Sequence, residues 1–243
     1  MKERWIYGFH AIRSRLRSSP GSVKEVWVDE GRQDARMRDL QVLMTSAKLT
    51  VRLADGKRLD KLVGGARHQG VVAKVEAISM AQTLDEVIEG IDGAPLIVVL
   101  DGVTDPHNLG AVLRSADAFG AHAVIAPKDN AVGLNATVEK VACGAAETVP
   151  YLMVTNLARC LDEMKDHRIW TVAMDADATK TVGQIDAKTG VAWVLGAEGA
   201  GLRQLTRKTC DETVKIPIVG TVESLNVSVS AAICLYESAR QRG

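Results

Sequence analysis

The first segment whose residues could do chemistry joins an apolar run to a helix. It reads Asp101-Gly-Val-Thr-Asp-Pro-His-Asn-Leu-Gly, and its proline suits the first turn of a helix. Apolar residues then recur at i, i+3, i+4 and i+7, at Leu109, Val112, Leu113 and Ala116. Arg114 lies roughly 140° from that stripe, so packing does not account for it. Arg114 is therefore a solvated helix arginine or a functional guanidinium, and Asn108 is a helix cap or part of a site.

The second segment is a run of glycines directly after another apolar run. It reads Gly196-Ala-Glu-Gly-Ala-Gly-Leu-Arg. Glycines this dense let the backbone approach a ligand closely and adopt conformations closed to other residues. The run is neither Gly-x-x-x-x-Gly-Lys nor Gly-x-Gly-x-x-Gly, which disfavours a nucleoside triphosphatase and an ordinary dehydrogenase. Glu198 either belongs to a ligand site or caps the following helix.

The third segment runs from Ile216 to Ala232 and combines a glycine turn with an unusually small-sided helix. Its residues include Pro217, Asn226 and Ser228. Small side chains allow a neighbouring element or a cofactor to approach the backbone. We expect Asn226 and Ser228 to be polar groups inside that packing, where buried amides must find partners.

Five buried-strand signals position these segments. Each is short, rich in Val and Ile, and followed by a helical pattern, and they are Leu96–Leu100, Ala123–Ala126, Ile169–Ala173, Val191–Leu195 and Thr213–Ile218. Such alternation predicts an α/β fold with a mainly parallel sheet and helices on both faces. Because ligands bind at the carboxyl ends of such strands, the loops after Leu100, Leu195 and Ile218 are the places for chemistry.

A small α/β module is predicted before residue 75. Helical patterns at Ala11–Leu16 and Met37–Lys48 alternate with the β-rich runs Glu25–Val28, Thr50–Leu53 and Gly70–Val75. Trp5, Tyr7 and Phe9 alternate at its start and are either core residues or base-stacking residues. We place this module at residues 1–75, a linker with one short helix at 76–94, and a second domain at 95–243.

The formal net charge of zero hides an asymmetry along the chain. Residues 1–75 contain 16 Lys and Arg against 8 Asp and Glu, whereas residues 76–243 contain 14 against 22. The asymmetry suggests a basic module that binds a polyanion, although solvated surface charge that fell unevenly would look the same.

The cysteines and the hydropathy of the sequence indicate the cellular compartment of the protein. Cys143, Cys160, Cys210 and Cys234 lie far apart, with no Cys-x-x-Cys pair and no histidine at a metal-ligand spacing, and we interpret them as reduced core thiols. The sequence shows neither a signal-peptide pattern nor an apolar stretch of membrane-spanning length. We therefore expect a cytoplasmic protein without a metal.

Taken together, the three segments resemble motifs one, two and three of the SpoU/TrmH family of SPOUT methyltransferases. The resemblance lies in Asn-Leu-Gly followed by an arginine, then Gly-x-Glu-Gly-x-Gly, then Ile-Pro and Ser-Leu-Asn-Val-Ser, in family order and spacing. Tyr7-Gly-Phe-His-Ala and His68-Gln-Gly-Val resemble the amino-terminal RNA-binding module of the branch that methylates guanosine in ribosomal RNA. With the three motifs and this module, the resemblance extends over nearly the whole chain.

The resemblance implies a carboxy-terminal trefoil knot, in which the segment after Ile216 threads back through an earlier loop. It also implies a homodimer with the knot regions facing each other. S-adenosyl-L-methionine would bind bent in the knot, held largely by main-chain groups, at Gly196, Ile216 and Leu225. The implied substrate is the ribose 2′-hydroxyl of a guanosine in the peptidyl-transferase-centre loop of 23S ribosomal RNA, either naked or in a large-subunit assembly intermediate.

The resemblance assigns activation of that hydroxyl to Arg114. A guanidinium has a pKa above about 12 and stays protonated, so we expect it to clamp the neighbouring phosphate and stabilise the developing alkoxide. Asn108, Glu198 and Asn226 would then fix the arginine and the ribose. Glu223 departs from the motif, where a small polar residue is expected, and it either alters the approach of the phosphate backbone or points to solvent.

Two other functions remain open from the sequence. A transfer-RNA guanosine 2′-O-methyltransferase would share the second domain, but that branch usually has short helical extensions in place of a basic module. A non-catalytic RNA-binding protein with a relic methylase domain is the other alternative. The four intact residues Asn108, Arg114, Glu198 and Asn226 argue against such decay.

Overall fold

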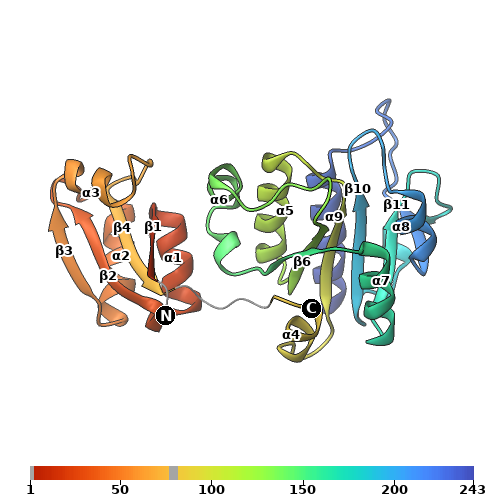
Figure 1. Cartoon of the computed structure of the whole chain (residues 1–243), viewed down its shortest axis with the longest axis horizontal. Coiled ribbons are helices and arrows are strands. Elements are labelled where there is room, and N and C mark those ends of the chain that lie inside the picture. The colour runs from red at the N-terminus through yellow and green to blue at the C-terminus, as the bar shows by residue number, and fades with distance from the viewer. Residues whose placement is uncertain (1–2, 77–81) are drawn as a thin grey trace. The chain divides into compact units, whose positions relative to one another are not determined.

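The computed structural model describes residues 3–76 and 82–243, so Met1, Lys2 and residues 77–81 of the predicted linker lie outside the described residues. The chain divides into two compact units (Figure 1). The first comprises Met1–Met80 with Cys143–Thr148, and the second comprises Ala81–Ala142 with Val149–Gly243.

The first unit is built on a sheet whose described strands follow the order β1-β4-β2-β3. These strands are β1 (Glu3–Tyr7), β4 (Val71–Glu76), β2 (Val23–Asp29) and β3 (Thr50–Ala54). Only the β2–β3 pair is parallel among these described strands. Trp5 and Tyr7 lie on β1, half-buried, and Phe9 is buried at the start of a helix, so the alternation marks a strand followed by a helix entry.

Helices cover both faces of this sheet. α1 (Phe9–Ser18) and α2 (Ala35–Ser46) bury Ile12, Met37 and Leu40 against Val26 and Val28 of β2. α3 (Gly56–Leu62) packs on the opposite face, where Leu59 joins Trp27 and Val72. Period-two alternation in the strands sends successive side chains to these two cores. The short 3₁₀ turns η1 (Pro20–Ser22) and η2 (Ala145–Glu147) complete the unit.

The second unit contains a parallel sheet with the described strand order β7-β6-β5-β10-β8-β11-β9. The strands are β5 (Leu96–Asp101), β6 (Ala123–Pro127), β7 (Tyr151–Val154), β8 (Trp170–Met174), β9 (Lys180–Thr181), β10 (Val191–Gly196) and β11 (Glu212–Lys215). Every pairing between these described strands is parallel. The predicted α/β fold with a mainly parallel sheet is confirmed.

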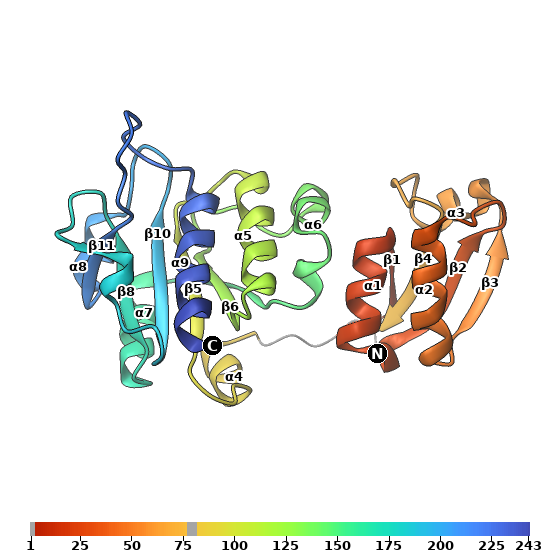
Figure 2. The ribbon, with the colours of Figure 1, turned by 180° about the vertical axis from the view of Figure 1, so that it is seen from behind.

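Helices lie on both faces of the parallel sheet. α4 (Leu84–Glu89) and α7 (Leu157–Asp166) bury Leu84, Val87 and Leu161 against one face. α5 (Pro106–Ala118) and α9 (Val227–Arg242) lie side by side on the other face (Figure 2), and buried Trp193 of β10 donates to Ser238 Oγ of α9 at 2.8 Å. The remaining elements are α6 (Ala136–Ala142), α8 (Gln204–Thr209) and the 3₁₀ turn η3 (Val182–Gln184).

One predicted strand is too long. The interpretation of Thr213–Ile218 as strand fails at its end, because β11 stops at Lys215. Pro217 lacks a backbone N–H and restrains the residue before it, so the ladder cannot continue through this position. Residues 216–226 follow as a segment without helix or strand.

All four cysteines are free thiols. Cys160 and Cys234 are buried, whereas Cys143 and Cys210 are partly buried. Burial raises the pKa of Cys160 and of Cys210 to about 12, so neither thiol ionises near neutral pH.

Candidate active site

Three loops of the second unit bring Asn108, Glu198 and Asn226 into one hydrogen-bonded cluster. The Asn108 side-chain amide donates to Glu198 Oε1 at 3.1 Å. The Asn226 amide donates to Asn108 Oδ1 at 2.9 Å and also to Glu198 Oε1. The structure therefore unites three of the four predicted catalytic residues, from positions 90 and 118 residues apart in the sequence.

Helix starts determine where the two asparagines lie. Asp105 caps α5 by accepting from the His107 backbone N–H at 2.8 Å, and Pro106 is the first helical residue, which places Asn108 in the first turn. Asn226 is itself the N-cap of α9, and its Oδ1 accepts from the Ser228 backbone N–H at 2.9 Å. The capping bond engages the oxygen and turns the amide nitrogen toward the cluster.

The cluster is open to solvent. Glu198 and Asn226 are exposed and Asn108 is half-buried, so the expectation that Asn226 lies inside the packing is wrong. Ser228 is half-buried and donates from Oγ to Asn226 Oδ1 at 2.6 Å. A helix N-cap sits at the end of its helix, where a large polar substrate can reach it.

The glycine-rich loop after β10 folds back onto its own strand. The Gly201 backbone N–H donates to the Ala197 carbonyl at 2.9 Å, and the two residues form an isolated antiparallel bridge. A Cβ atom added at Gly196 would overlap the backbone of Gly201 and Leu202. Position 196 therefore has no space for any side chain.

A buried carboxylate ties this loop to the neighbouring strand. Asp101, the last residue of β5, accepts from the Arg203 backbone N–H at 3.0 Å and from Arg203 Nε at 2.6 Å. Asp101 is only 1% exposed. It lies directly opposite Gly196 in the parallel pairing of β5 and β10. Asp101 lies in the first sequence segment and Arg203 in the second, but no sequence signal joins residues 102 positions apart.

The segment after β11 offers main-chain groups to a ligand. Its residues 216–225 make no backbone hydrogen bond to any other residue of the described chain. Ile216 and Leu225, predicted to bind a cofactor, are half-buried at its two ends. Free peptide donors and acceptors fit a cofactor that is held by backbone groups. Glu223, the departure from the motif, is exposed.

Arg114 does not join the cluster in this structure. It lies on α5, exposed, and has no hydrogen-bond or ion-pair partner in the part of the chain that is described. Asn108 lies on the same helix six residues earlier, about 9 Å along the helix axis. The guanidinium is therefore unpaired and accessible, as a phosphate-binding group must be, and His107 beside the cluster is likewise exposed.

The described residues contain neither a metal-binding cluster nor a membrane-spanning helix. Residues 3–76 and 82–243 contain no group of three or more His, Cys, Asp or Glu side chains placed to hold a metal ion. In the same residues, every helix falls short of the length and apolar content that a membrane crossing needs.

Two family models match the chain. Residues 95–236 match the SpoU rRNA Methylase family. Residues 5–81 match a model described as RNA 2′-O ribose methyltransferase substrate binding. The methylase match lies in the second unit apart from residues 143–148, and the substrate-binding match lies in the first unit apart from residue 81.

Individual relatives are similar over nearly their whole lengths. A Bordetella pertussis protein named 23S rRNA (guanosine-2′-O-)-methyltransferase RlmB is 57% identical over 237 residues, which are 98% of this chain and 97% of that protein. The protein of the same name from Neisseria meningitidis serogroup B is 52% identical over 240 residues, 99% of this chain and 96% of that protein. Among solved structures, the SpoU methyltransferase AviRb from Streptomyces viridochromogenes, in complex with the cofactor AdoMet, is 27% identical with a TM-score of 0.74, covering 99% of this chain and 90% of that one.

Proposed function

The chain belongs to the SpoU rRNA Methylase family, and from that premise we propose that it transfers a methyl group from S-adenosylmethionine to the ribose 2′-hydroxyl of a guanosine in 23S ribosomal RNA. The target lies in the peptidyl-transferase-centre loop. The observation that carries this proposal is the Asn108–Glu198–Asn226 cluster, formed at the carboxyl ends of β5 and β10, where parallel sheets bind their ligands.

The cofactor supplies an electrophilic methyl group on a sulfonium. We assign its contacts to Gly196, Ile216 and Leu225, because the first has no side chain and the other two bound a segment with free peptide groups. Asp101 holds Arg203 and with it the glycine loop, so that the backbone at Gly196 keeps its shape. Side-chain identity matters less here than backbone conformation.

The chain's own residues orient the sugar. The cluster presents a carboxylate and two amides whose positions are fixed by mutual hydrogen bonds and by the cap of α9. We propose that Asn108, Glu198 and Asn226 hold the ribose, while Arg114 binds the adjoining phosphate and stabilises the negative charge that develops on the 2′-oxygen. Holding the nucleophile in line with the methyl group lowers the entropic part of the barrier.

We further propose the domain roles and the knot. Residues 1–75 form the RNA substrate-binding domain, 76–94 the linker, and 95–243 the catalytic domain. In the catalytic domain, the segment after Ile216 threads through an earlier loop as a trefoil knot. The excess of Lys and Arg before residue 75 favours contact with RNA phosphates, and a substrate in ribosomal RNA favours a cytoplasmic location.

A hollow between α5 and α9 supports a homodimer. Its volume is about 400 Å³, and its walls include Ala111 and Ser115 of α5 and Val229, Ala232 and Tyr236 of α9. Val229 is 46% exposed and Tyr236 is 57% exposed, which leaves apolar surface uncovered. We propose that a second copy of the chain packs its small-sided α9 into this hollow.

The proposed dimer predicts that one carboxylate introduced into the hollow will separate the two copies. We expect the wild-type chain to sediment as a dimer and Val229→Glu to sediment mainly as a monomer, because the carboxylate would be buried without a partner. Val42→Glu is the matched control, since Val42 is also an exposed valine on a helix, α2 of the first unit. A Val229→Glu dimer as tight as the wild type, measured by analytical ultracentrifugation, would rule out this interface.

The function is tested by locating the methyl group. Purified chain is incubated with methyl-labelled S-adenosylmethionine and with ribosomal RNA from a strain that lacks this protein. We expect label in 2′-O-methylguanosine at a single position of the 23S peptidyl-transferase-centre loop. Assembly intermediates from the same strain are assayed in parallel, since either form could be the substrate.

Three other outcomes of these experiments would each contradict the proposed function. Label in transfer RNA but not in 23S RNA would favour the transfer-RNA enzyme. RNA binding without uptake of S-adenosylmethionine in calorimetry would favour the non-catalytic protein. Label on a nucleobase would contradict ribose chemistry altogether.

A further inference from the structure

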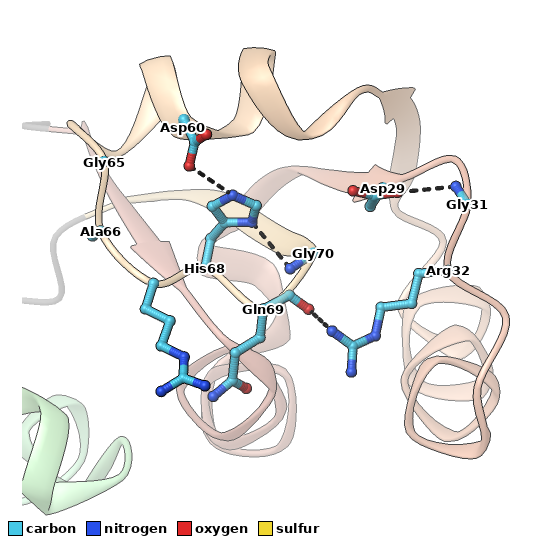
Figure 3. A pocket seen from close by; sticks show the side chains of 10 residues that line it. Asp29, Gly31, Arg32, Asp60, Gly65, Ala66, His68, Gln69 and Gly70 are labelled. Carbon is cyan, nitrogen blue, oxygen red and sulfur yellow. Dashed lines mark hydrogen bonds and ion pairs between the residues drawn. The ribbon is translucent and has the colours of Figure 1, made fainter.

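The first unit contains a polar hollow of about 630 Å³. The turn after β2 and the loop between α3 and β4 form its walls (Figure 3). Its polar side chains are Asp29, Arg32, Asp60, Arg67, His68 and Gln69. Ligand sites in proteins commonly have volumes of about 300–1,000 Å³, so the hollow is large enough for a nucleotide-sized group.

His68 fixes one wall of the hollow. Its Nδ1 accepts from the Gly70 backbone N–H at 3.0 Å, so the neutral ring carries its proton on Nε2. Nε2 then donates to Asp60 Oδ1 at 3.1 Å (Figure 3). Both ring nitrogens are engaged, and the loop before β4 is thereby tied to α3.

Arg32 fixes the opposite wall. Its guanidinium donates to the Gln69 carbonyl and pairs with Asp34, and it lies 4.7 Å from the centroid of the Phe9 ring. Gly70 has a φ of 80°, and a Cβ there would come within 3.0 Å of Arg32 Cδ. The hollow is preformed, so binding a ligand would cost little ordering of the loop.

The charges of the hollow disfavour a phosphate. Two carboxylates, of Asp29 and Asp60, stand beside two guanidiniums, of Arg32 and Arg67, so the local charge balances. The side chains of Arg67 and Gln69 are exposed and have no hydrogen-bond partner in the part of the chain that is described. Free donors and acceptors without net charge match a neutral group that has both, and a nucleobase edge is such a group.

We propose that this hollow receives one unpaired base of the substrate RNA, with Arg67 and Gln69 on the base edge and the base stacked on the Arg32 guanidinium. The proposal rests on the proposed function, since it takes the ligand to be RNA. Unpaired bases can be splayed out and stacked on guanidinium planes, whereas a paired A-form helix hides its base edges. The hollow therefore selects looped RNA, while the basic charge of residues 1–75 attracts any RNA.

The test combines changes in the RNA with changes in the protein. An RNA hairpin with the peptidyl-transferase-centre loop is made with each loop base removed in turn, and its affinity for the full chain is measured at fixed salt. For the wild type, we expect loss of one particular base to weaken binding roughly 10-fold or more. For Arg67→Ala and for Gln69→Ala, removing that same base should have little further effect, because the contact is already lost.

Arg36→Ala is the matched control. Arg36 is an exposed arginine on α2 outside the hollow, and its loss removes the same charge from the same unit. This variant should bind all hairpins somewhat more weakly and keep the full penalty for the missing base. All three substituted side chains are exposed, so unfolding midpoints should stay at the wild-type value.

Three results would overturn the proposal: no loop base matters to the wild type, the wild type does not bind the hairpin, or Arg67→Ala keeps the wild-type penalty. Methyl transfer is assayed separately on the same hairpin. Base-dependent binding without any transfer would contradict the proposed function and leave this site standing. Methyl transfer without base-dependent binding would support the proposed function and contradict this base-binding site.

Discussion

Arg114→Lys should lower the rate of methyl transfer at saturating substrates by about 100-fold or more, since one group that stabilises developing charge is typically worth that much. Lysine keeps the positive charge but loses the planar, bidentate guanidinium that suits a phosphate. Because Arg114 is exposed and has no partner in the described chain, the substitution should leave the free energy of unfolding within about 0.5 kcal/mol of the wild type.

The measurement separates chemistry from binding. Single-turnover transfer to 23S ribosomal RNA gives the rate, and calorimetry gives the affinity for S-adenosylmethionine, which should not change. Arg159→Lys is the control, since Arg159 is also an exposed helix arginine of the second unit and forms an ion pair with Glu163 of its own helix. Full turnover by Arg114→Lys would eliminate the phosphate clamp.

Gly196→Ala should abolish measurable binding of S-adenosylmethionine. The new methyl group would overlap the backbone of Gly201 and Leu202, and backbone tied by the Asp101–Arg203 pair cannot move aside as a flexible side chain could. Overpacking of this kind costs about 3 kcal/mol, so the free energy of unfolding should fall by that order. The loop that remains folded would no longer present the same main-chain groups.

Gly183→Ala supplies the comparison for that experiment. Gly183 lies in η3 of the second unit, and the nearest atom to a Cβ there would be Glu237 Oε1 at 3.9 Å, an ordinary contact. Urea titration and calorimetry on both variants should show a large loss for Gly196→Ala and nearly wild-type values for Gly183→Ala. Equal donor affinity in the two variants would mean that the close approach at Gly196 does not shape the cofactor site.

The parallel sheet was predictable because its central strands are continuous apolar runs between helical patterns. β5, β6, β8 and β10 lie within a residue or so of the predicted ranges. β7 and β9 were not predicted, since β7 has four residues and β9 two, both at sheet edges where burial imposes little pattern. Short edge strands depend on the partner strand more than on their own sequence.

The sequence pointed to the members of the hydrogen-bonded cluster, but not to the bonds between them. Motif spacing pointed to Asn108, Glu198 and Asn226, yet a sequence does not say that one amide donates to both other side chains. The capping role of Asn226 was also missed, because the irregular segment before it carries no sequence pattern that marks where α9 begins. The Asp101–Arg203 pair depends on two strands lying next to each other, which only the tertiary fold supplies.

The long sequence separations within the cluster have a consequence for the order of events during synthesis. Asn226 is translated 28 residues after Glu198 and 118 residues after Asn108. The cluster therefore closes some of the longest loops in the domain. Contacts of such separation form late, because chain entropy must be lost before they contribute. On the role proposed for this cluster, a nascent or misfolded copy would lack methylating activity, and only a chain that has finished folding would modify ribosomal RNA.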